Sequence, residues 1–271
     1  MDLIIENSEY KLNIDEIDLK LHKDSTSSIA TLLIIINREK FLNAINIDIL
    51  NELHNIFDFY KNDKFVRSIV ITGNGSKAFI AGADIKNMAN YSPEEAYAYS
   101  RAGQSLVQLI ENYNKPIIAA INGYALGGGC EIASACHLRY ASNNAIFGQP
   151  EVKLGIIAGW GGTQNLPKIV GLSNALDLLI SGRTIDVNEA YRIGLVNAIF
   201  NQEDLIDEVM KITFVINRNS PNAISNTLSA IYNEDLMDDF QKEANLFKDS
   251  FKHNDSRIGL EAFLNKEKPK F

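Results

Sequence analysis

The chain alternates short runs of aliphatic residues with longer segments in which apolar residues recur at helical spacing. Three of the runs, at 29–36, 68–72 and 116–121, consist largely of isoleucine, valine, leucine and alanine, as expected of strands buried on both faces. Helical segments are predicted between them, at 45–61 and 92–113. Because strands that alternate with helices form sheets covered by those helices, the pattern predicts an α/β fold.

Local signals mark where several helices start. Asn46 can cap the first helix through its side chain. Ser92 supplies a serine cap, a proline follows it in the first turn, and Glu95 is placed to complete a capping box. Asp186 and Glu189 repeat the capping-box pattern, so another helix is predicted to start there.

Beyond about residue 200 the pattern is almost entirely helical. Pro221 can open one helix, and residues 236–251 carry amphipathic spacing. No linker rich in proline, serine and glycine separates a second globule. We therefore expect a core over residues 1–200 and a helical C-terminal region over residues 201–271 that packs onto it.

Composition and charge disfavour several classes of protein. The chain is 46% hydrophobic, which suits a globular protein with a large core, and its net charge of -8 disfavours a nucleic-acid surface. No basic segment precedes an apolar one at the N-terminus, and no apolar run approaches the roughly 20 residues that span a bilayer. Cys130 and Cys136 lie close together, which argues against a disulfide framework. We expect a cytoplasmic protein with no membrane or nucleic-acid partner.

Two glutamates stand beside glycines in the middle of the chain. Glu131 ends the string Gly-Gly-Gly-Cys-Glu, and Glu151 ends the string Phe-Gly-Gln-Pro-Glu. Two buried carboxyl groups near one another can split their proton affinities, so that one serves as base and the other as acid. Glycine-rich backbone at a helix start can bind a developing oxyanion. The pattern indicates an acid/base site, although the helix dipole alone also favours an acidic residue in a first turn.

Other motifs give weaker signals. Residues 123–129 lack the Gly-Lys-Ser/Thr ending of a P-loop, and no GxGxxG follows the first strand, so nucleotide-binding folds are disfavoured. The chain has no GxSxG elbow, no HExxH and no paired Cys/His spacing, so we expect no serine nucleophile and no metal. Cys130 at a helix start could be a nucleophile with a lowered pKa, but a structural buried cysteine is the commoner case.

Several strings closely resemble the crotonase, or enoyl-CoA hydratase/isomerase, family. They are KAFIAGADIK at 77–86, PIIAAINGYALGGGCE at 116–131, FGQPE at 147–151 and GWGGTQ at 159–164. The resemblance spans roughly residues 29–200. It implies an α/β spiral of ββα units with a helical C-terminal region, which also contributes to a homotrimer or a dimer of trimers (a hexamer).

The resemblance also implies an activity. Hydratases of this family use two acids, matching Glu131 and Glu151, whereas many of its isomerases use one. We therefore expect a lyase that adds water reversibly and in the syn sense to a trans-2-enoyl-CoA, giving the 3-hydroxyacyl-CoA, as in the β-oxidation of fatty acids. Short, crotonyl-CoA-like substrates are favoured. Glu131 is expected to deprotonate the water and Glu151 to protonate C2, a division of roles that stays a hypothesis. No cofactor is expected, because coenzyme A is part of the acyl-CoA substrate.

Binding residues follow from motif positions in the resemblance. The thioester oxygen is expected to bind the backbone N–H groups of Ala83 and Gly128, an oxyanion hole in which the loss of one donor costs about 3 kcal/mol. Further substrate contacts are expected from Lys40, Leu42, Ala81, Asp84, Ile85, Lys86 and Gly159. Ala158 stands where proline is common in the family, and the bulky Trp160 follows it, so both bear on the shape of the acyl pocket.

Alternatives stay open at this point. On the same scaffold the chain could be an enoyl-CoA isomerase or a hydratase of cyclic or branched enoyl-CoAs. From a different class, it could be an RNA-binding or scaffold relative, which the acidic balance and the intact pair of glutamates disfavour. The lysines near the C-terminus form either a solvated tail or a contact with CoA phosphates: Lys252, Lys266, Lys268 and Lys270.

Overall fold

The computed structural model describes residues 3–24, 28–84, 88, 91–232, 252, 254–268 and 270. Its strands are β1 (Leu3–Asn7), β2 (Ile17–Asp24), β3 (Ala30–Ile36), β4 (Val66–Gly73), β5 (Ala78–Ile80), β6 (Ile117–Ile121), β7 (Tyr124–Leu126), β8 (Leu138–Ser142), β9 (Ile146–Gly148), β10 (Thr184–Asp186) and β11 (Ala198–Phe200). Its α-helices are α1 (Ile47–Tyr60), α2 (Pro93–Glu111), α3 (Gly128–Ala135), α4 (Gly162–Val170), α5 (Leu172–Ser181), α6 (Val187–Arg192), α7 (Leu205–Asn217), α8 (Pro221–Tyr232) and α10 (Asn254–Asn265). Short 3₁₀ helices are η1 (Glu39–Phe41) and η3 (Pro150–Leu154).

The described strands form two sheets. The larger has the order β1-β2-β3-β4-β6-β8-β11 and the smaller the order β10-β9-β7-β5. From β3 to β11 the strands of the larger sheet pair in parallel, whereas β1 and β2 pair antiparallel. In the smaller sheet β5, β7 and β9 are parallel and β10 is antiparallel. The predicted α/β class is confirmed.

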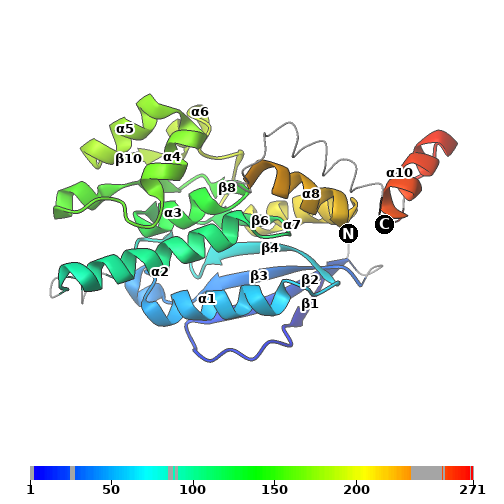
Figure 1. Cartoon of the computed structure of the whole chain (residues 1–271), viewed down its shortest axis with the longest axis horizontal. Coiled ribbons are helices and arrows are strands. Elements are labelled where there is room, and N and C mark those ends of the chain that lie inside the picture. The colour runs from blue at the N-terminus through cyan, green and yellow to red at the C-terminus, as the bar shows by residue number, and fades with distance from the viewer. Residues whose placement is uncertain are drawn as a thin grey trace.

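Successive strand pairs send one strand to each sheet. β4 joins the larger sheet and β5 the smaller, after which α2 follows. The same order recurs for β6 and β7 before α3, and for β8 and β9 before η3. This ββα progression is the spiral implied by the family resemblance, and it is confirmed. Figure 1 shows α1 and α2 side by side across the larger sheet.

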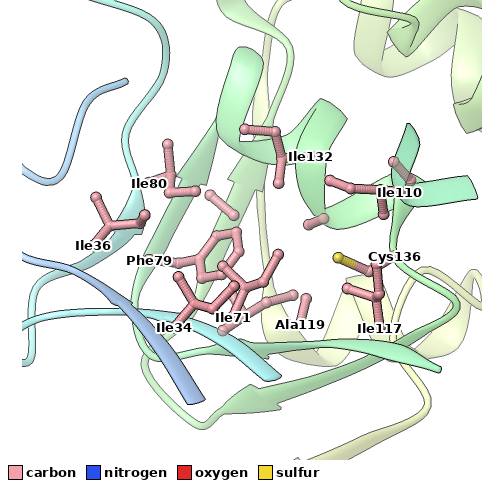
Figure 2. Close-up of a cluster of buried hydrophobic side chains, with 14 of the residues drawn as sticks. Ile34, Ile36, Ile71, Phe79, Ile80, Ile110, Ile117, Ala119, Ile132 and Cys136 are labelled. Carbon is pink, nitrogen blue, oxygen red and sulfur yellow. The ribbon is translucent and has the colours of Figure 1, made fainter. Parts of the chain in front are cut away.

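The central strands of the larger sheet are buried on both faces, as the aliphatic runs predict. One face contributes to the main core, and Figure 2 shows side chains from both sheets meeting those of α2 and α3 there: Ile34, Ile71, Phe79, Ile110, Ile117 and Ile132. The alternate residues face the other way and pack against α7: Leu33, Val70, Ile118 and Ala120 against Leu205, Val209, Met210 and Phe214. Because side chains alternate along a strand, these residues lie on the second face of the sheet, and α7 covers them there.

Two of the predicted helix starts are formed by the residues expected. The Asn46 side chain accepts a hydrogen bond of 2.8 Å from the Ile49 amide at the start of α1. Ser92 and Glu95 form a complete capping box at α2, each side chain accepting from the backbone amide of the other.

The third predicted start, at α6, is only half formed. Asp186 accepts from the Glu189 amide at 2.9 Å. The Glu189 side chain does not return the bond, because both its oxygens accept from the Arg183 guanidinium at 2.7 and 3.0 Å. A bidentate, charge-assisted pair outcompetes the single bond to a backbone amide.

The described part of the C-terminal region is mostly helical, with α7, α8 and α10 following β11. Figure 1 places α10 at one end of the long axis and α4, α5 and α6 toward the other. The amphipathic helix predicted at 236–251 lies outside the described residues. None of the described helices has both the length and the hydrophobicity to cross a membrane.

Candidate active site

A cavity of about 940 Å³ opens where the spiral brings five segments together. Its walls come from residues 40–44, residues 81–84, helix α2, the start of α3 and residues 150–164. Nine of the predicted site residues line it: Lys40, Leu42, Ala81, Ala83, Asp84, Gly128, Glu131, Glu151 and Gly159. The other two, Ile85 and Lys86, lie outside the described residues. Segments distant in the sequence thus share one cavity.

Glu131 lies in the first turn of α3 and is 2% exposed. Its carboxylate is bound by the start of another helix: Oε1 accepts from the Trp160 amide at 2.7 Å and from the Gly162 amide at 2.8 Å. Gly161, between these two donors, has φ +113°, a conformation that side chains disfavour, and it turns both amides toward one oxygen. Gly162 is the first residue of α4, so the dipole of that helix also favours a negative charge here.

Burial and hydrogen bonding act on Glu131 in opposite directions. Burial, and after it the charge of Glu151, raise the pKa of the Glu131 carboxyl to about 7, against the lowering effect of hydrogen bonds from the amides of Gly162 and Trp160. A carboxyl group with a pKa near neutrality can both take and release a proton at physiological pH. The electrostatic coupling between the two glutamates, both lining the same cavity, fits the paired-acid prediction.

Glu151 lies in η3 and is partly exposed. Burial raises the pKa of Glu151, and a hydrogen bond from its own backbone amide lowers it. With the amide nitrogen of Gln149 turned toward it, that side chain donates to both carboxylate oxygens at 3.0 and 3.2 Å. Gln149 is 1% exposed, so its amide would lose a needed partner in any other orientation.

The backbone amides of Ala83 and Gly128 approach one another at the cavity wall. A Cβ on Gly128 would lie 3.3 Å from the Ala83 nitrogen. A parallel bridge joins Ala83 to Ile45 through its neighbours: the Ile45 amide donates to Gly82 O at 3.0 Å and the Asp84 amide to Ile45 O at 2.8 Å. Among the described residues, nothing accepts from the Ala83 amide itself. The Gly128 amide opens α3, where helix geometry supplies no acceptor, so both are available donors.

The loop that carries Lys40 and Leu42 is fixed to the Ala83 segment. Arg38 forms a mostly buried ion pair of 2.8 Å with Asp84, and its guanidinium lies 4.3 Å from the centre of the Phe41 ring. The Ala81 amide donates to Leu42 O at 3.0 Å. Because these contacts hold the two loops to each other, movement of one would displace the donor at Ala83.

Gly159 is held by helix α2. Its carbonyl oxygen accepts from the Ser100 hydroxyl at 2.6 Å and from the Gln104 amide at 3.1 Å. The next residue, Trp160, packs on Tyr99 of the same helix, with ring centroids 5.6 Å apart. Helix α2 therefore fixes the segment whose amides bind Glu131.

The alternative of Cys130 as an activated nucleophile is wrong. The Cys130 side chain is buried, and this burial, together with the charges of Glu131 and Glu151, raises its pKa to about 12. The thiolate is therefore strongly disfavoured despite the helix start, since adjacent carboxylates and a dry environment oppose a second negative charge. Cys130 is a structural residue.

Two further predictions concern metals and the C-terminal lysines. No group of three or more His, Cys, Asp or Glu side chains among the described residues could hold a metal ion. The four C-terminal lysines are exposed and are not among the described residues that line the cavity: Lys252, Lys266, Lys268 and Lys270. Within one chain the solvated interpretation fits them.

The sequence does not reveal the roles of several residues of the site. Gln149 stands inside a quoted string, but its bond to Glu151 depends on a turn that spacing does not reveal. The amides of Trp160 and Gly162 carry no side-chain signal at all. Arg38 likewise carries no motif signal, because its partner Asp84 lies far away in the sequence.

The chain is similar to known proteins of one family. A family model described as enoyl-CoA hydratase/isomerase matches residues 25–271. The chain is 44% identical over 243 residues to a crotonyl-CoA hydratase of Syntrophomonas wolfei, covering 88% of this chain and 93% of the relative. It is 40% identical over 240 residues to a short-chain-enoyl-CoA hydratase of Clostridium acetobutylicum, covering 87% and 92%. A crystal structure of an enoyl-CoA hydratase from Bacillus anthracis superposes with a TM-score of 0.87 at 34% identity, covering 95% of this chain and 99% of that one.

Proposed function

Because the chain belongs to the enoyl-CoA hydratase/isomerase, or crotonase, family, we propose that it is an enoyl-CoA hydratase acting on short trans-2-enoyl-CoA thioesters. The enzyme adds water across the C2=C3 bond in the syn sense and gives the 3-hydroxyacyl-CoA, or removes it in the reverse direction. This is the hydration step of fatty-acid β-oxidation. The chemistry needs no cofactor, since coenzyme A belongs to the substrate.

The thioester oxygen binds between the amides of Ala83 and Gly128. As water attacks C3, electron density moves through the conjugated system to this oxygen, and the two N–H donors stabilise the developing enolate charge. Both donors are fixed before substrate arrives, one by a bridged loop and the other by a helix start. Substrate binding then needs little rearrangement of the oxyanion hole.

Glu131 serves as the base. One of its oxygens is occupied by the amides of Trp160 and Gly162, which stabilise the ionised form and leave the other oxygen for the water. The water oxygen bonds to C3 while its proton passes to this carboxylate. Its pKa of about 7 suits that role, since a base is most effective when its pKa lies near the working pH.

Glu151 serves as the acid. Burial raises its pKa, which favours the protonated form that delivers a proton to C2 as the enolate collapses. The two acids share one proton between them before the reaction, and proton exchange with solvent restores that state afterwards.

The observation that carries the proposal is the presence of both carboxyl groups in one cavity with two free backbone donors. Purified protein should consume crotonyl-CoA with loss of the ultraviolet absorbance of the conjugated thioester. Reaction in D₂O should give a product labelled at C2 with syn stereochemistry. Folded protein that binds acyl-CoA but leaves this absorbance unchanged with both short and medium enoyl-CoAs would contradict a hydratase, and conversion of a 3-enoyl-CoA would then point to an isomerase.

The assembly proposed is a homotrimer or a dimer of such trimers. Helix α5 presents an apolar stripe of exposed side chains at every fourth residue, Leu172, Leu176 and Ile180, and Ile157 in the loop after η3 is 71% exposed. Contiguous exposed apolar side chains of this kind support contact between copies of the chain. Light scattering on the native protein and on Ile180→Lys tests this, with dissociation to smaller species expected for the variant.

The division of labour along the chain is part of the same proposal. Residues 1–200 form the spiral core with the active site, and residues 201–271 form the helical region that packs on it and contributes to oligomer contacts. The lining residues that the structure describes all fall between positions 40 and 164, in support of the first part. Cys130 and Cys136 are both free and buried, in support of a cytoplasmic location with reducing conditions.

A further inference from the structure

Trp160 spans the cavity wall between two helices. Its five-membered ring lies against Gly103 of α2, where a Cβ would come within 2.2 Å of the ring. Its six-membered ring lies against Gly128 at the start of α3, where a Cβ would come within 2.9 Å. Two glycines therefore make room for one indole, which is 3% exposed and lines the cavity.

The indole is held in this position from several sides. Tyr99 packs on it at 5.6 Å between ring centroids. Its own backbone amide binds Glu131, and the carbonyl before it is bound by Ser100 and Gln104. A rotation of the side chain would have to displace helix α2 or the ring of Tyr99, so the ring acts as a fixed wall.

The position of this wall relative to the reacting atoms has a direct consequence for the substrate. The thioester oxygen is assigned to the amides of Ala83 and Gly128, and C3 to the side of Glu131. The indole touches Gly128 by its ring and Glu131 by its backbone, so it stands next to the acyl carbons that follow C3. Carbons further along a chain meet the ring.

We propose that Trp160 is the residue that sets the acyl-chain length, closing the cavity to enoyl-CoAs longer than the short-chain range. The inference rests on the proposed function and specifies its substrate class. Steric exclusion by a rigid ring discriminates strongly, since a chain that does not fit must displace close-packed side chains, whereas one missing methylene costs only modest binding. Trp160 is a specificity-determining residue and takes no part in the proton transfers.

The test is a chain-length series. The second-order rate constant kcat/KM is measured with four-, six-, eight- and ten-carbon trans-2-enoyl-CoAs for the native enzyme, Trp160→Ala and Trp160→Leu. The native enzyme should prefer the four-carbon substrate to the ten-carbon one by about 100-fold, and Trp160→Ala should reduce that preference at least about tenfold. Trp160→Leu should fall between them. An unchanged ratio in a folded Trp160→Ala enzyme overturns the proposal, and if that variant does not fold, an unchanged ratio in Trp160→Leu does so.

A matched control trims a buried aromatic ring outside the cavity. Phe57 of α1 is fully buried and packs on Tyr113, and Phe57→Leu loosens the core without touching the acyl pocket. Its chain-length ratio should equal that of the native enzyme. A ratio that shifts as much in Phe57→Leu as in Trp160→Ala would show general loosening and overturn the assignment to Trp160.

Ligand binding separates this inference from the proposed function. Trp160 is the single tryptophan of the chain, so its emission reports directly on an acyl group beside it. Saturating butyryl-CoA should change that emission, and an unchanged spectrum overturns the proposed contact. The ratio of dissociation constants for butyryl-CoA and decanoyl-CoA should converge in Trp160→Ala. Absence of crotonyl-CoA hydration by the native enzyme would sink the hydratase assignment alone, whereas hydration with an unchanged binding ratio would sink only the role of Trp160.

Discussion

The two carboxyl groups of the cavity are held by different kinds of structure. Glu131 lies on a helix, and its carboxylate accepts from two backbone amides, that of Trp160 just before α4 and that of Gly162 at the first residue of α4. Glu151 lies on a single 3₁₀ turn, and it depends on the Gln149 side chain and on its own amide. Backbone donors at helix starts cannot rotate away, whereas a side-chain donor can. The site therefore has a rigid half around Glu131, suited to placing a water molecule, and a more adaptable half around Glu151, suited to delivering a proton to carbon.

The largest effect should come from removing either acid. Glu131→Gln and Glu151→Gln keep the shape of each side chain but abolish proton transfer, so kcat should fall by about 10²–10⁴-fold in each. Stopped-flow absorbance with crotonyl-CoA measures this, and calorimetry with butyryl-CoA should show nearly native affinity, because neither acid holds the CoA moiety. Near-normal turnover in one variant would remove that glutamate from the mechanism, and only the other glutamate would then transfer protons.

The second largest effect, on kcat/KM, should come from a change at Gly128, whose backbone amide is one donor of the oxyanion hole. Gly128→Val would place carbon atoms against the Trp160 ring and near the Ala83 amide, so kcat/KM should fall by about 10²–10³-fold. Gly171→Ala is the matched control, since its Cβ would meet nothing within 4 Å but its φ of +77° imposes backbone strain. The control should lose some stability and keep its kcat, which distinguishes a blocked oxyanion hole from a general cost of replacing glycine.

A third prediction compares the two acids through the pH dependence of stability. The pKa of Glu131 is about 7 in the folded protein and 4.5 without the fold, so the folded state binds its proton more tightly. The contribution of this group to the free energy of unfolding is therefore present at pH 4.5 and falls by about 3 kcal/mol as pH rises to 7. Glu131→Gln does not titrate and should gain that amount on the parent between pH 5 and 8 in urea unfolding. Glu151→Gln should gain less, because its carboxyl group is more exposed; an equal gain would contradict the asymmetry.

The smallest effect, a shift of the pH–rate profile, should come from substitution of Gln149, the side chain that donates to Glu151. Gln149→Leu removes the donor that favours ionised Glu151, so the pKa of that carboxyl should rise, by roughly one unit. The basic limb of the pH–rate profile, which reports the protonated acid, should move to higher pH with little change in its maximum. Gln149→Glu, which adds a like charge, should move the limb in the same direction and further. A limb that stays in place in both variants would show that Gln149 has only a packing role.

The sequence predicts features of the fold that depend on neighbouring residues better than features that depend on contacts between distant segments. The caps at Asn46 and Ser92 follow from rules that span three residues, and both are formed. Glu189 fits the same capping-box rule, but its carboxylate accepts from Arg183 and not from the backbone amide of Asp186, because the nearby cation competes for it. Strands of three residues such as β5 and β7 carry no pattern that assigns them to a second sheet, so the spiral followed only from the family resemblance.

The site shows the same limit. The positions of Glu131 and Glu151 were found from motifs, but the amides that bind Glu131 lie 29 and 31 residues away from it. The fit of Trp160 between Gly103 and Gly128 likewise exists only once α2 and α3 are packed. The structural role favoured for Cys130 agrees with its burial, because a helix start lowers a thiol pKa only where desolvation and neighbouring anions do not outweigh it.

The sealing of the larger sheet by α7 bears on how the chain matures during synthesis. Leu33, Val70 and Ile118 leave the ribosome long before Leu205 to Phe214, which cover them. A nascent chain that has completed the described lining residues of the cavity still exposes apolar side chains on the second face of its larger sheet. Growing chains on neighbouring ribosomes can associate through that surface, so α7 protects the part of the chain that was made before it.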